Sequence, residues 1–599
     1  MKSIRYILIC LVLLLWSVSL LAQWSGSVDL SGGLGGMEGS VVNDDAPMYH
    51  GLIKGEFQLN YMTDKFSWNA KVYGKWEPKT TDNASLQYKN ERLNIVYKAA
   101  TTKPLTTGLR SDFHWTPSPE KKTSFWVLYE YTNDRARNHS LNFDGDIEEM
   151  QKFSYYYELP VMDAHKLGAG LKTYRSYNSG RNILQSSVTF QTNHSDRANT
   201  WIVFKTGEGV NGGTAVDIEG TEGQIWKYRI TPNNTDFNFD GDIHLKNTLI
   251  DGDVQLKLTP GLRLATKHTL DYNSGATWVV LPEGGGIWVD STSLRESFNF
   301  LSLRVEPFLA ADFKWKNLEA HADYAAQVYG RRLNDDFHRQ PLQIRGVYPV
   351  GKGNIKWSIN SKHSLNLTNR MSVVHPDYIK ICWYDRTAGY LNQLYRGNEN
   401  LLSPQTRRYA LEYEFKPNRF LTKTSLSYTR VADEIDQTWT NEEIDGREYK
   451  VFKWINSADS YTVGVEEKLG WHGKVITADV SVSYNKSRRI AKSDGAIKNS
   501  YFWLLKGDIS ANLGKGWSVG AFAHYQSKMA TFFTLFKEYC ELNIRVKKDF
   551  KRFTVFLEGR DLLDQERVTT FESQETKECW IEEVRGNKRI IVLGANWKF

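Results

Sequence analysis

The chain has 599 residues, of which 41% are hydrophobic, 24% charged and 13% aromatic, and this aromatic content excludes a disordered chain. The formal net charge of +7 comes from 76 basic and 69 acidic residues mixed along the chain, which argues against the clustered basic surface of a nucleic-acid-binding protein. No apolar run of about 18 residues follows the first two dozen, so a helical membrane protein is excluded, whereas a membrane β-barrel is not.

The N-terminus has the pattern of an export signal. Lys2 and Arg5 precede a short apolar core at residues 7–15, and Ala22 offers a small residue for cleavage. The sequence therefore predicts a signal peptide at residues 1–22 and a single exported domain at residues 23–599.

From Trp24 onward the dominant pattern has a period of two residues, which indicates β-strands with one apolar and one polar face. Leu318, Ala320 and Tyr324, for example, alternate with Glu319 and Asp323. A soluble β-sandwich shows the same alternation, so this pattern alone leaves both classes open.

The connections between the expected strands alternate in length. Short polar turns are expected at residues 62–65, 89–92, 116–121, 160–165, 193–197, 259–261, 314–317, 360–364, 416–419, 470–474, 512–516 and 547–551. Mostly longer loops lie between them, for example at 207–234, 273–297, 431–450 and 562–587. This alternation favours an all-β fold, a transmembrane antiparallel β-barrel of the outer-membrane type, with about 22–26 strands and its short turns in the periplasm. Phe125, Trp126, Tyr129 and Tyr131 are expected in its interfacial aromatic girdles.

The last expected strand ends the chain. Ile591, Leu593, Ala595, Trp597 and Phe599 share one face, so this strand is expected to pair with the first strand and close the barrel. A terminal phenylalanine is also the usual signal of outer-membrane barrels for membrane assembly. Phe599 therefore predicts contact with the barrel-assembly machinery and a location in the cell outer membrane.

Several segments resemble the barrel domain of TonB-dependent outer-membrane receptors, in the outer membrane protein beta-barrel family. YRGNENLLSPQTRRYALEYEF at residues 395–415 is similar to the family's passage Gly-Asn-Pro-x-Leu-x-Pro-Glu followed by an aromatic strand. Glu399 stands for the first proline of that passage, Gln405 for its glutamate, and one residue is added. Residues 84–99, 352–370 and 552–566 match less specifically. The resemblance implies a receptor or solute-transport role.

One departure limits what the resemblance implies. Receptors of this family carry an N-terminal plug domain, but here the strand pattern begins at residues 25–30 and the Gly-rich stretch 32–47 is expected to be the first loop. The expected barrel thus has no plug domain, and TonB-driven import by this chain alone is not expected.

Candidate ligand-binding residues are few. The hexapeptide NFDGDI occurs at residues 142–147 and 238–243, and its alternating oxygens suggest calcium ligands, although Asp-Gly equally makes a tight turn. The candidate calcium ligands are Asn142, Asp144, Asp146, Asn238, Asp240 and Asp242. No other cofactor is expected, and since no H-E-x-x-H occurs and the 13 histidines are scattered, an enzyme is not expected.

Polar residues on the inner faces of the strands are expected to line a wet lumen. These residues are Glu319, Asp323, Gln327, Glu412, Glu414 and Asp479. Without its own plug, the lumen is open, closed by outer loops, or filled by a plug, lipoprotein or other envelope partner. Three roles follow: a solute-transporting or receptor barrel, a non-transporting scaffold barrel, or a surface barrel that binds a ligand through the aromatic residues of 381–395. The sequence does not name the solute.

Overall fold

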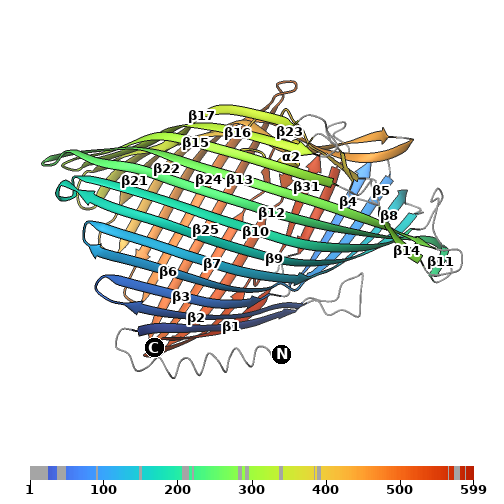
Figure 1. The fold of residues 1–599 in the computed structure, drawn as a ribbon, viewed down its shortest axis with the longest axis horizontal. Coiled ribbons are helices and arrows are strands. Elements are labelled where there is room, and N and C mark those ends of the chain that lie inside the picture. Colours follow the sequence, from blue (N-terminus) through green and yellow to red (C-terminus); the bar gives the residue numbers. More distant parts are fainter. Residues whose placement is uncertain are drawn as a thin grey trace.

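The structure is a computed structural model that describes a closed antiparallel barrel (Figure 1). The described residues are 24–36, 49–77, 79–89, 92–146, 152–205, 215–218, 221–280, 286–290, 296–335, 341–382, 385–387, 393–444, 446–563, 565–572, 580–586 and 589–598. Within them no helix is long and apolar enough to cross a membrane. The predicted signal peptide and Phe599 lie outside the described residues.

The wall of the barrel consists of 22 antiparallel strands within the described part of the chain, at the lower end of the expected number. They are β1 (Trp24–Gly36), β2 (Tyr49–Met62), β3 (Phe66–Trp76), β6 (Leu105–Ser118), β7 (Lys121–Arg135), β9 (Lys152–Tyr177), β10 (Asn182–Lys205), β12 (Thr221–Ile250), β13 (Val254–Val280), β15 (Glu296–Trp315), β16 (Leu318–Asp335), β17 (Leu342–Ser358), β18 (His363–Val373), β21 (Gln405–Phe415), β22 (Phe420–Ile444), β23 (Arg447–His472), β24 (Ile476–Ala491), β25 (Ile497–Gly514), β26 (Trp517–Gln526), β29 (Tyr539–Asp549), β30 (Phe553–Arg560) and β33 (Ile590–Lys598). β33 pairs with β1, with Trp597 opposite Val28, so the predicted closure is confirmed.

The strands form because each has an apolar face that lipid can cover. On β22 and β23, Leu426, Tyr428, Val463 and Val465 are exposed on the outer face. Neighbouring residues such as Ser425 point the other way and are buried inside the barrel. Closure pairs every edge strand, so no row of backbone N–H and C=O groups has to face the hydrocarbon.

Short turns join the wall strands at one end of the barrel, at residues 63–65, 119–120, 178–181, 251–253, 316–317, 359–362, 416–419, 473–475, 515–516 and 550–552. The turn between β25 and β26 shows the local reason. Gly514, Lys515 and Gly516 all have positive φ, which glycine adopts without strain. A Cβ at Gly516 would also overlap the carbonyl oxygen of Asp549.

Three of the expected short turns are wrong, because residues 160–165, 193–197 and 259–261 lie inside β9, β10 and β13. The short connection expected at 89–92 is confirmed, since one strand ends at Lys89 and the next begins at Arg92, but it joins an outer hairpin. At 160–165 the reason is a break in the neighbouring strands. Ala136, between β7 and β8 (Arg137–Asp146), donates its N–H to the carbonyl of Pro160 at 2.9 Å, so the proline sits where pairing is interrupted.

The polar residues 193–197 do not end the strand, because β10 continues beyond the part whose outer face is apolar. His194 contacts the hydroxyl of Thr235 at 2.8 Å, and Asn233 donates to Asp196 at 2.7 Å. Polar residues in a long barrel strand therefore mark the edge of the membrane there, and the sequence pattern alone does not distinguish this from a turn.

The opposite end of the barrel carries further strands where long loops were expected. They are β4 (Lys79–Lys89), β5 (Arg92–Thr102), β8 (Arg137–Asp146), β11 (Ala215–Ile218), β14 (Gly286–Asp290), β19 (Asp385–Thr387), β20 (Gln393–Arg396), β27 (Met529–Ala530), β28 (Thr534–Phe536), β31 (Glu566–Glu572) and β32 (Trp580–Gly586). β28, β31, β32, β4, β5, β8 and β9 pair in this order and extend the wall (Figure 1). The expected loop 431–450 is mostly the strand-built tip of the β22–β23 hairpin.

The four aromatic residues expected in the interfacial girdles lie on both faces of β7. Phe125, Tyr129 and Tyr131 alternate on one face, and Phe125 and Tyr129 are exposed. Trp126 lies on the other face instead, where a Cβ at Gly170 would overlap its indole ring. Glycine is required there because the ring lies against the backbone of the neighbouring strand.

Candidate functional site

The residues predicted to line the lumen lie on the polar faces of their strands, and four of the six have a charged partner on another strand. Asp323 accepts from Arg263 at 2.6 Å, and Glu412 lies 2.8 Å from Lys423. The pairs of Glu319 with Lys314 at 3.0 Å and of Asp479 with Lys468 at 3.3 Å follow the same pattern. These cross-strand pairs hold opposite charges side by side on a wetted wall.

Glu414 has a different setting at the end of the barrel that carries the short turns. It lines a polar hollow of about 410 Å³ together with Lys356, Lys362 and Lys416. Gln327 also differs, because it is buried and belongs to a cluster described below.

The two hexapeptides predicted as calcium sites or turns form neither a loop nor a turn. Residues 142–146 lie in β8, and their side chains are outside the described part. Residues 238–243 lie within β12, where Asp242 contacts His244 at 2.6 Å and Arg263 at 3.7 Å. An extended strand cannot wrap several oxygens around one ion. Among the described residues no three His, Cys, Asp or Glu side chains are placed to hold a metal.

The most enclosed part of the barrel lies under the connection between β18 and β21, which we call the 374–404 segment. On β16 the residues of the inner face are nearly inaccessible, while the alternating outer residues Tyr324 and Val328 are exposed. This β16 stripe comprises Gln327, Tyr329, Arg331 and Leu333, which are 2–6% exposed. The described parts of the segment, residues 374–382, 385–387 and 393–404, therefore fold inward and cover the inner wall instead of projecting from the rim.

An apolar cluster attaches the segment to the wall. Helix α2 (Tyr378–Ile381) is capped by Asp377, whose carboxylate accepts the N–H of Lys380 at 3.1 Å. Ile381 and Cys382 are 0% and 1% exposed and pack in one cluster with Phe298 of β15 and other apolar residues. Since full burial of an aliphatic side chain contributes about 1.5–3 kcal/mol, this cluster is the main attachment of the segment.

A chain of hydrogen bonds provides the polar attachment. Neutral His375 accepts from the Ser403 hydroxyl at 2.8 Å and donates from Nε2 to Gln327 at 2.7 Å. Gln327 in turn donates to Glu306 at 2.6 Å. The imidazole also stacks on Tyr329 with ring centroids 3.5 Å apart. Burial, assisted by the charges of two nearby arginines, lowers the pKa of His375 to about 4, so it is neutral at pH 7.

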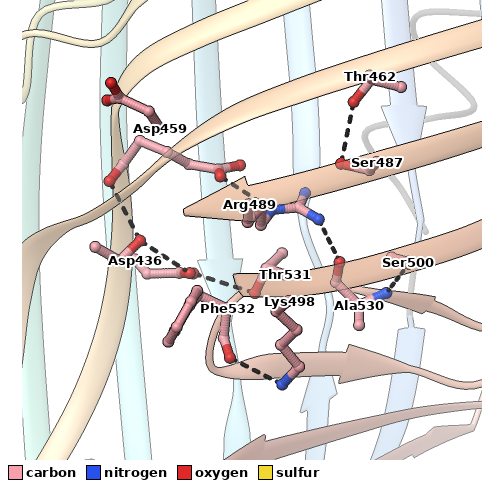
Figure 2. Close-up of polar contacts among 12 residues, drawn as sticks. Asp436, Asp459, Thr462, Ser487, Arg489, Lys498, Ser500, Ala530, Thr531 and Phe532 are labelled. Atoms are coloured by element: carbon pink, nitrogen blue, oxygen red, sulfur yellow. Dashed lines mark hydrogen bonds and ion pairs between the residues drawn. The ribbon is translucent and has the colours of Figure 1, made fainter. Parts of the chain in front are cut away.

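A second connection, which we call the 527–538 segment, joins β26 to β29 and is held against the inner faces of β22, β24 and β25. Figure 2 shows that side chains of the wall bind its backbone at Ala530 and Phe532 and the side chain of Thr531. The contacts are Arg489 Nη1 to the Ala530 carbonyl at 2.5 Å, Lys498 Nζ to the Phe532 carbonyl at 2.9 Å, the Ala530 N–H to Ser500 Oγ at 3.0 Å, and Thr531 Oγ1 to Asp436 at 3.4 Å. Arg489 is itself oriented by Glu434 at 3.0 Å.

The two segments meet the same pair of strands. Asn456 of β23 donates to the Leu402 carbonyl of the 374–404 segment at 3.1 Å and to the Asp433 carbonyl of β22 at 2.9 Å. Asp436, which holds the 527–538 segment, follows closely on β22. The tip of this hairpin packs on the β31–β32 hairpin through Trp439 and Ile581. Both inner segments and the β31–β32 hairpin therefore contact the β22–β23 hairpin.

The aromatic stretch 381–395, predicted as a surface for ligands, is only partly described. Ile381 is buried, and Tyr395 stacks on Phe452 with centroids 5.2 Å apart. Residues 383–384 and 388–392, with three of the four aromatic residues, lie outside the described part.

Sequence reasoning missed both inner segments and the burial of Arg331. A signal exists in SFNFLSL at residues 297–303, where Phe298 and Phe300 alternate with Leu301 and Leu303. Both faces of this strand are apolar, which indicates that something other than water covers its inner face.

Comparisons with known proteins agree with this architecture. Residues 348–597 match the sequence profile of the outer membrane protein beta-barrel family. No protein of curated function matches the sequence.

Solved structures with a similar fold include three receptors. The siderophore receptor PirA from Pseudomonas aeruginosa is 9% identical with a TM-score of 0.56, over 97% of this chain and 81% of that one. The siderophore receptor PiuA from Acinetobacter baumannii is 11% identical with a TM-score of 0.57, over 96% and 82%. The ferric-catecholate import receptor Fiu from E. coli K12 is 12% identical with a TM-score of 0.57, over 96% and 82%. At these identities the likeness shows the fold alone. The protein is thus an outer-membrane β-barrel with the fold of siderophore receptor barrels, and residues 348–597 carry the pattern of the outer membrane protein beta-barrel family.

Proposed function

We propose that this barrel passes a solute across the outer membrane through a lumen that its own inner segments narrow, without TonB-driven import by this chain alone. The supporting observation is that the described residues build the barrel and its inner segments. The described residues from Trp24 to Lys598 form wall strands, turns, outer strands and the two inner segments, and none of them forms a separate plug domain. A barrel of this width needs something to restrict it. The inner segments supply that restriction.

We propose further that the polar wall residues line the path of the solute. Glu319, Asp323, Glu412 and Asp479 are each paired with a cation, which leaves the wall polar but locally neutral. Such a wall hydrates the lumen without selecting strongly for one sign of charge. Gln327 has another role, because it is covered by the 374–404 segment and holds His375.

A second candidate function is that of an interaction barrel whose lumen or rim receives a plug, lipoprotein or other envelope protein. The observation that favours it is the outer sheet. β4, β5, β8, β31 and β32 extend the wall as a paired, strand-built rim, which gives a partner a rigid surface. The solute-transport proposal is preferred because the restriction of the lumen comes from the chain itself.

The conductance of the purified chain in a planar bilayer distinguishes the transport barrel from the interaction barrel. Transport predicts steady conductance from the barrel alone and unchanged passage when the proton gradient of cells is dissipated. The interaction barrel predicts no conductance from the folded barrel and stoichiometric recovery of another envelope protein in mild detergent. Conductance from a barrel that purifies alone would reject the second candidate.

A further inference from the structure

Arg331 is a buried cation that forms no ion pair with a carboxylate of the described residues. It lies on the β16 stripe and is 4% exposed. Nη1 donates to the carbonyl oxygen of Pro376 at 2.8 Å, whereas Nε and Nη2 are buried and make no hydrogen bond within the described residues. A guanidinium has five N–H donors, and a buried charge is stable only when it is paired and its donors are satisfied.

The acidic side chains nearby do not pair with Arg331. Glu306 is taken by Arg304 at 3.3 Å and by the amide of Gln327 at 2.6 Å. Asp377 attracts the guanidinium at longer range, and its carboxylate caps helix α2 of the 374–404 segment. Within the described residues no carboxylate lies within 4.0 Å of the Arg331 guanidinium. Lifting the segment would carry Asp377 away and leave the positive charge of Arg331 on the wall.

The segment that covers Arg331 has the layout of a lid. Its two ends leave neighbouring strands side by side, since the N–H of Val374 donates to the carbonyl of Pro404 at 3.0 Å. Its lumenal side is exposed at Val374, Ile379 and Leu402, so nothing described lies over it. Lifting the segment about its paired ends would uncover Arg331 without disturbing the barrel wall.

We propose that Arg331 binds an anionic group of the solute, a carboxylate or phosphate, when the 374–404 segment lifts. The planar fork of the guanidinium matches two oxygens of such a group, and the donors that are unused in the closed state become the ligands. The anion binds only the lifted state and so favours it, because a ligand shifts an equilibrium by its difference in affinity for the two states. This inference rests on the proposed passage of a solute through the lumen.

Cys382 offers a direct reporter, because it is 1% exposed in the closed segment. The full chain with Cys10, Cys540 and Cys579 replaced by serine retains one thiol. Maleimide labelling of this thiol is measured in inorganic phosphate, in citrate and in chloride of equal ionic strength. Phosphate and citrate are expected to accelerate labelling about 5- to 150-fold over chloride, the usual range of coupling between a ligand and a conformational change. Phosphate otherwise strengthens burial, so a general salt effect would act in the opposite direction.

Two substitutions and a matched control identify the residue. Arg331→Met is expected to abolish the acceleration, whereas Arg331→Lys keeps the charge and retains part of it. Arg332→Met removes the same charge one residue away, on the exposed face, and is expected to respond like the wild type. Equal labelling in phosphate, citrate and chloride, or full acceleration in Arg331→Met, would overturn the inference. If Arg331→Met does not fold, the inference is tested by comparing the wild type with Arg331→Lys: the wild type must show the acceleration, and Arg331→Lys must show less of it.

The labelling assay does not require transport, so the two proposals fail separately. A barrel that conducts but shows no anion-dependent labelling loses only the Arg331 site. A barrel that labels faster in phosphate but does not conduct keeps an anion-binding site and loses the transport proposal.

Discussion

Ile381 is expected to control how often the 374–404 segment leaves the wall. Its side chain is 0% exposed and packs with Phe298 and Leu333 in the cluster that attaches the segment. Truncation of a buried isoleucine to alanine costs about 2–5 kcal/mol, and the lower part of this range applies where the surroundings can relax. The segment faces the lumen and can relax, so Ile381→Ala should destabilise the closed position by about 2–3 kcal/mol. This corresponds to an increase of about 30- to 140-fold in the lifted population.

The assay is the labelling rate of Cys382 in the single-cysteine chain, since the thiol is accessible only when the segment lifts. Ile379→Ala is the matched control, because Ile379 lies in the same helix but is 43% exposed. It should label at nearly the wild-type rate. Heat-modifiable mobility on gels checks that both barrels remain folded. The reasoning is refuted if Ile381→Ala labels no faster than Ile379→Ala, or if its barrel unfolds with the segment.

Three further outcomes are expected. Gly170→Ala should destabilise the barrel by about 1–3 kcal/mol, because its Cβ would overlap Trp126. Gly507→Ala is the control and should leave the stability unchanged, because the space around Gly507 is open. Urea titration of the folded barrel compares the stabilities of the two variants. Arg489→Ala should free the 527–538 segment, because the segment loses a 2.5 Å hydrogen bond to its backbone. Protease cleavage within the segment should then increase without unfolding of the wall. Unchanged cleavage would mean that Arg489 does not hold the segment. Acidification should speed the labelling of Cys382 relative to that of free cysteine at the same pH, a ratio that removes the fall in reactive thiolate. The pKa of His375 is about 4 in the closed segment against 6.5 when exposed, so the closed position loses stability as the pH falls from 6.5 toward 4. A relative labelling rate that is flat over this window would count against it.

The acid response depends on the groups that face His375. Arg331 and Arg304 repel a second positive charge there, while Glu306 is already engaged by Arg304 and Gln327. Protonation of Nδ1 also removes the acceptor of the Ser403 hydrogen bond. His375→Asn, which cannot titrate, should make the labelling rate relative to free cysteine independent of pH in this window.

The wall of the barrel could be predicted from the sequence because its determinants are local. Alternating residues give the strands, and the shared face of Ile591, Leu593 and Trp597 gives the closing strand. Turns were predicted wrongly where polar residues mark the membrane edge of a strand that continues, as at 193–197. A period-two pattern reports the two faces of a strand, and it does not report how far the strand extends beyond the lipid.

The inner segments could not be predicted in this way, because they depend on contacts between residues distant in sequence. Arg331 meets Pro376, and Arg489 meets Ala530, across gaps that no local pattern encodes. The six lumen residues were chosen for their polarity, and polarity did not separate Gln327, which is buried under the segment, from Glu319, which remains accessible. The calcium hypothesis failed to gain support at 238–243 because the hexapeptide lies in a strand, where the aspartates face lumenal partners.

Single-channel conductance of the purified, refolded chain shows whether the chain's own inner segments restrict the lumen. We expect a steady conductance from the wild type without a partner, and a larger one from Arg489→Ala, whose 527–538 segment is released from the wall. If neither folded form conducts, the inner segments are not what restricts the lumen, and a partner that fills it should be sought.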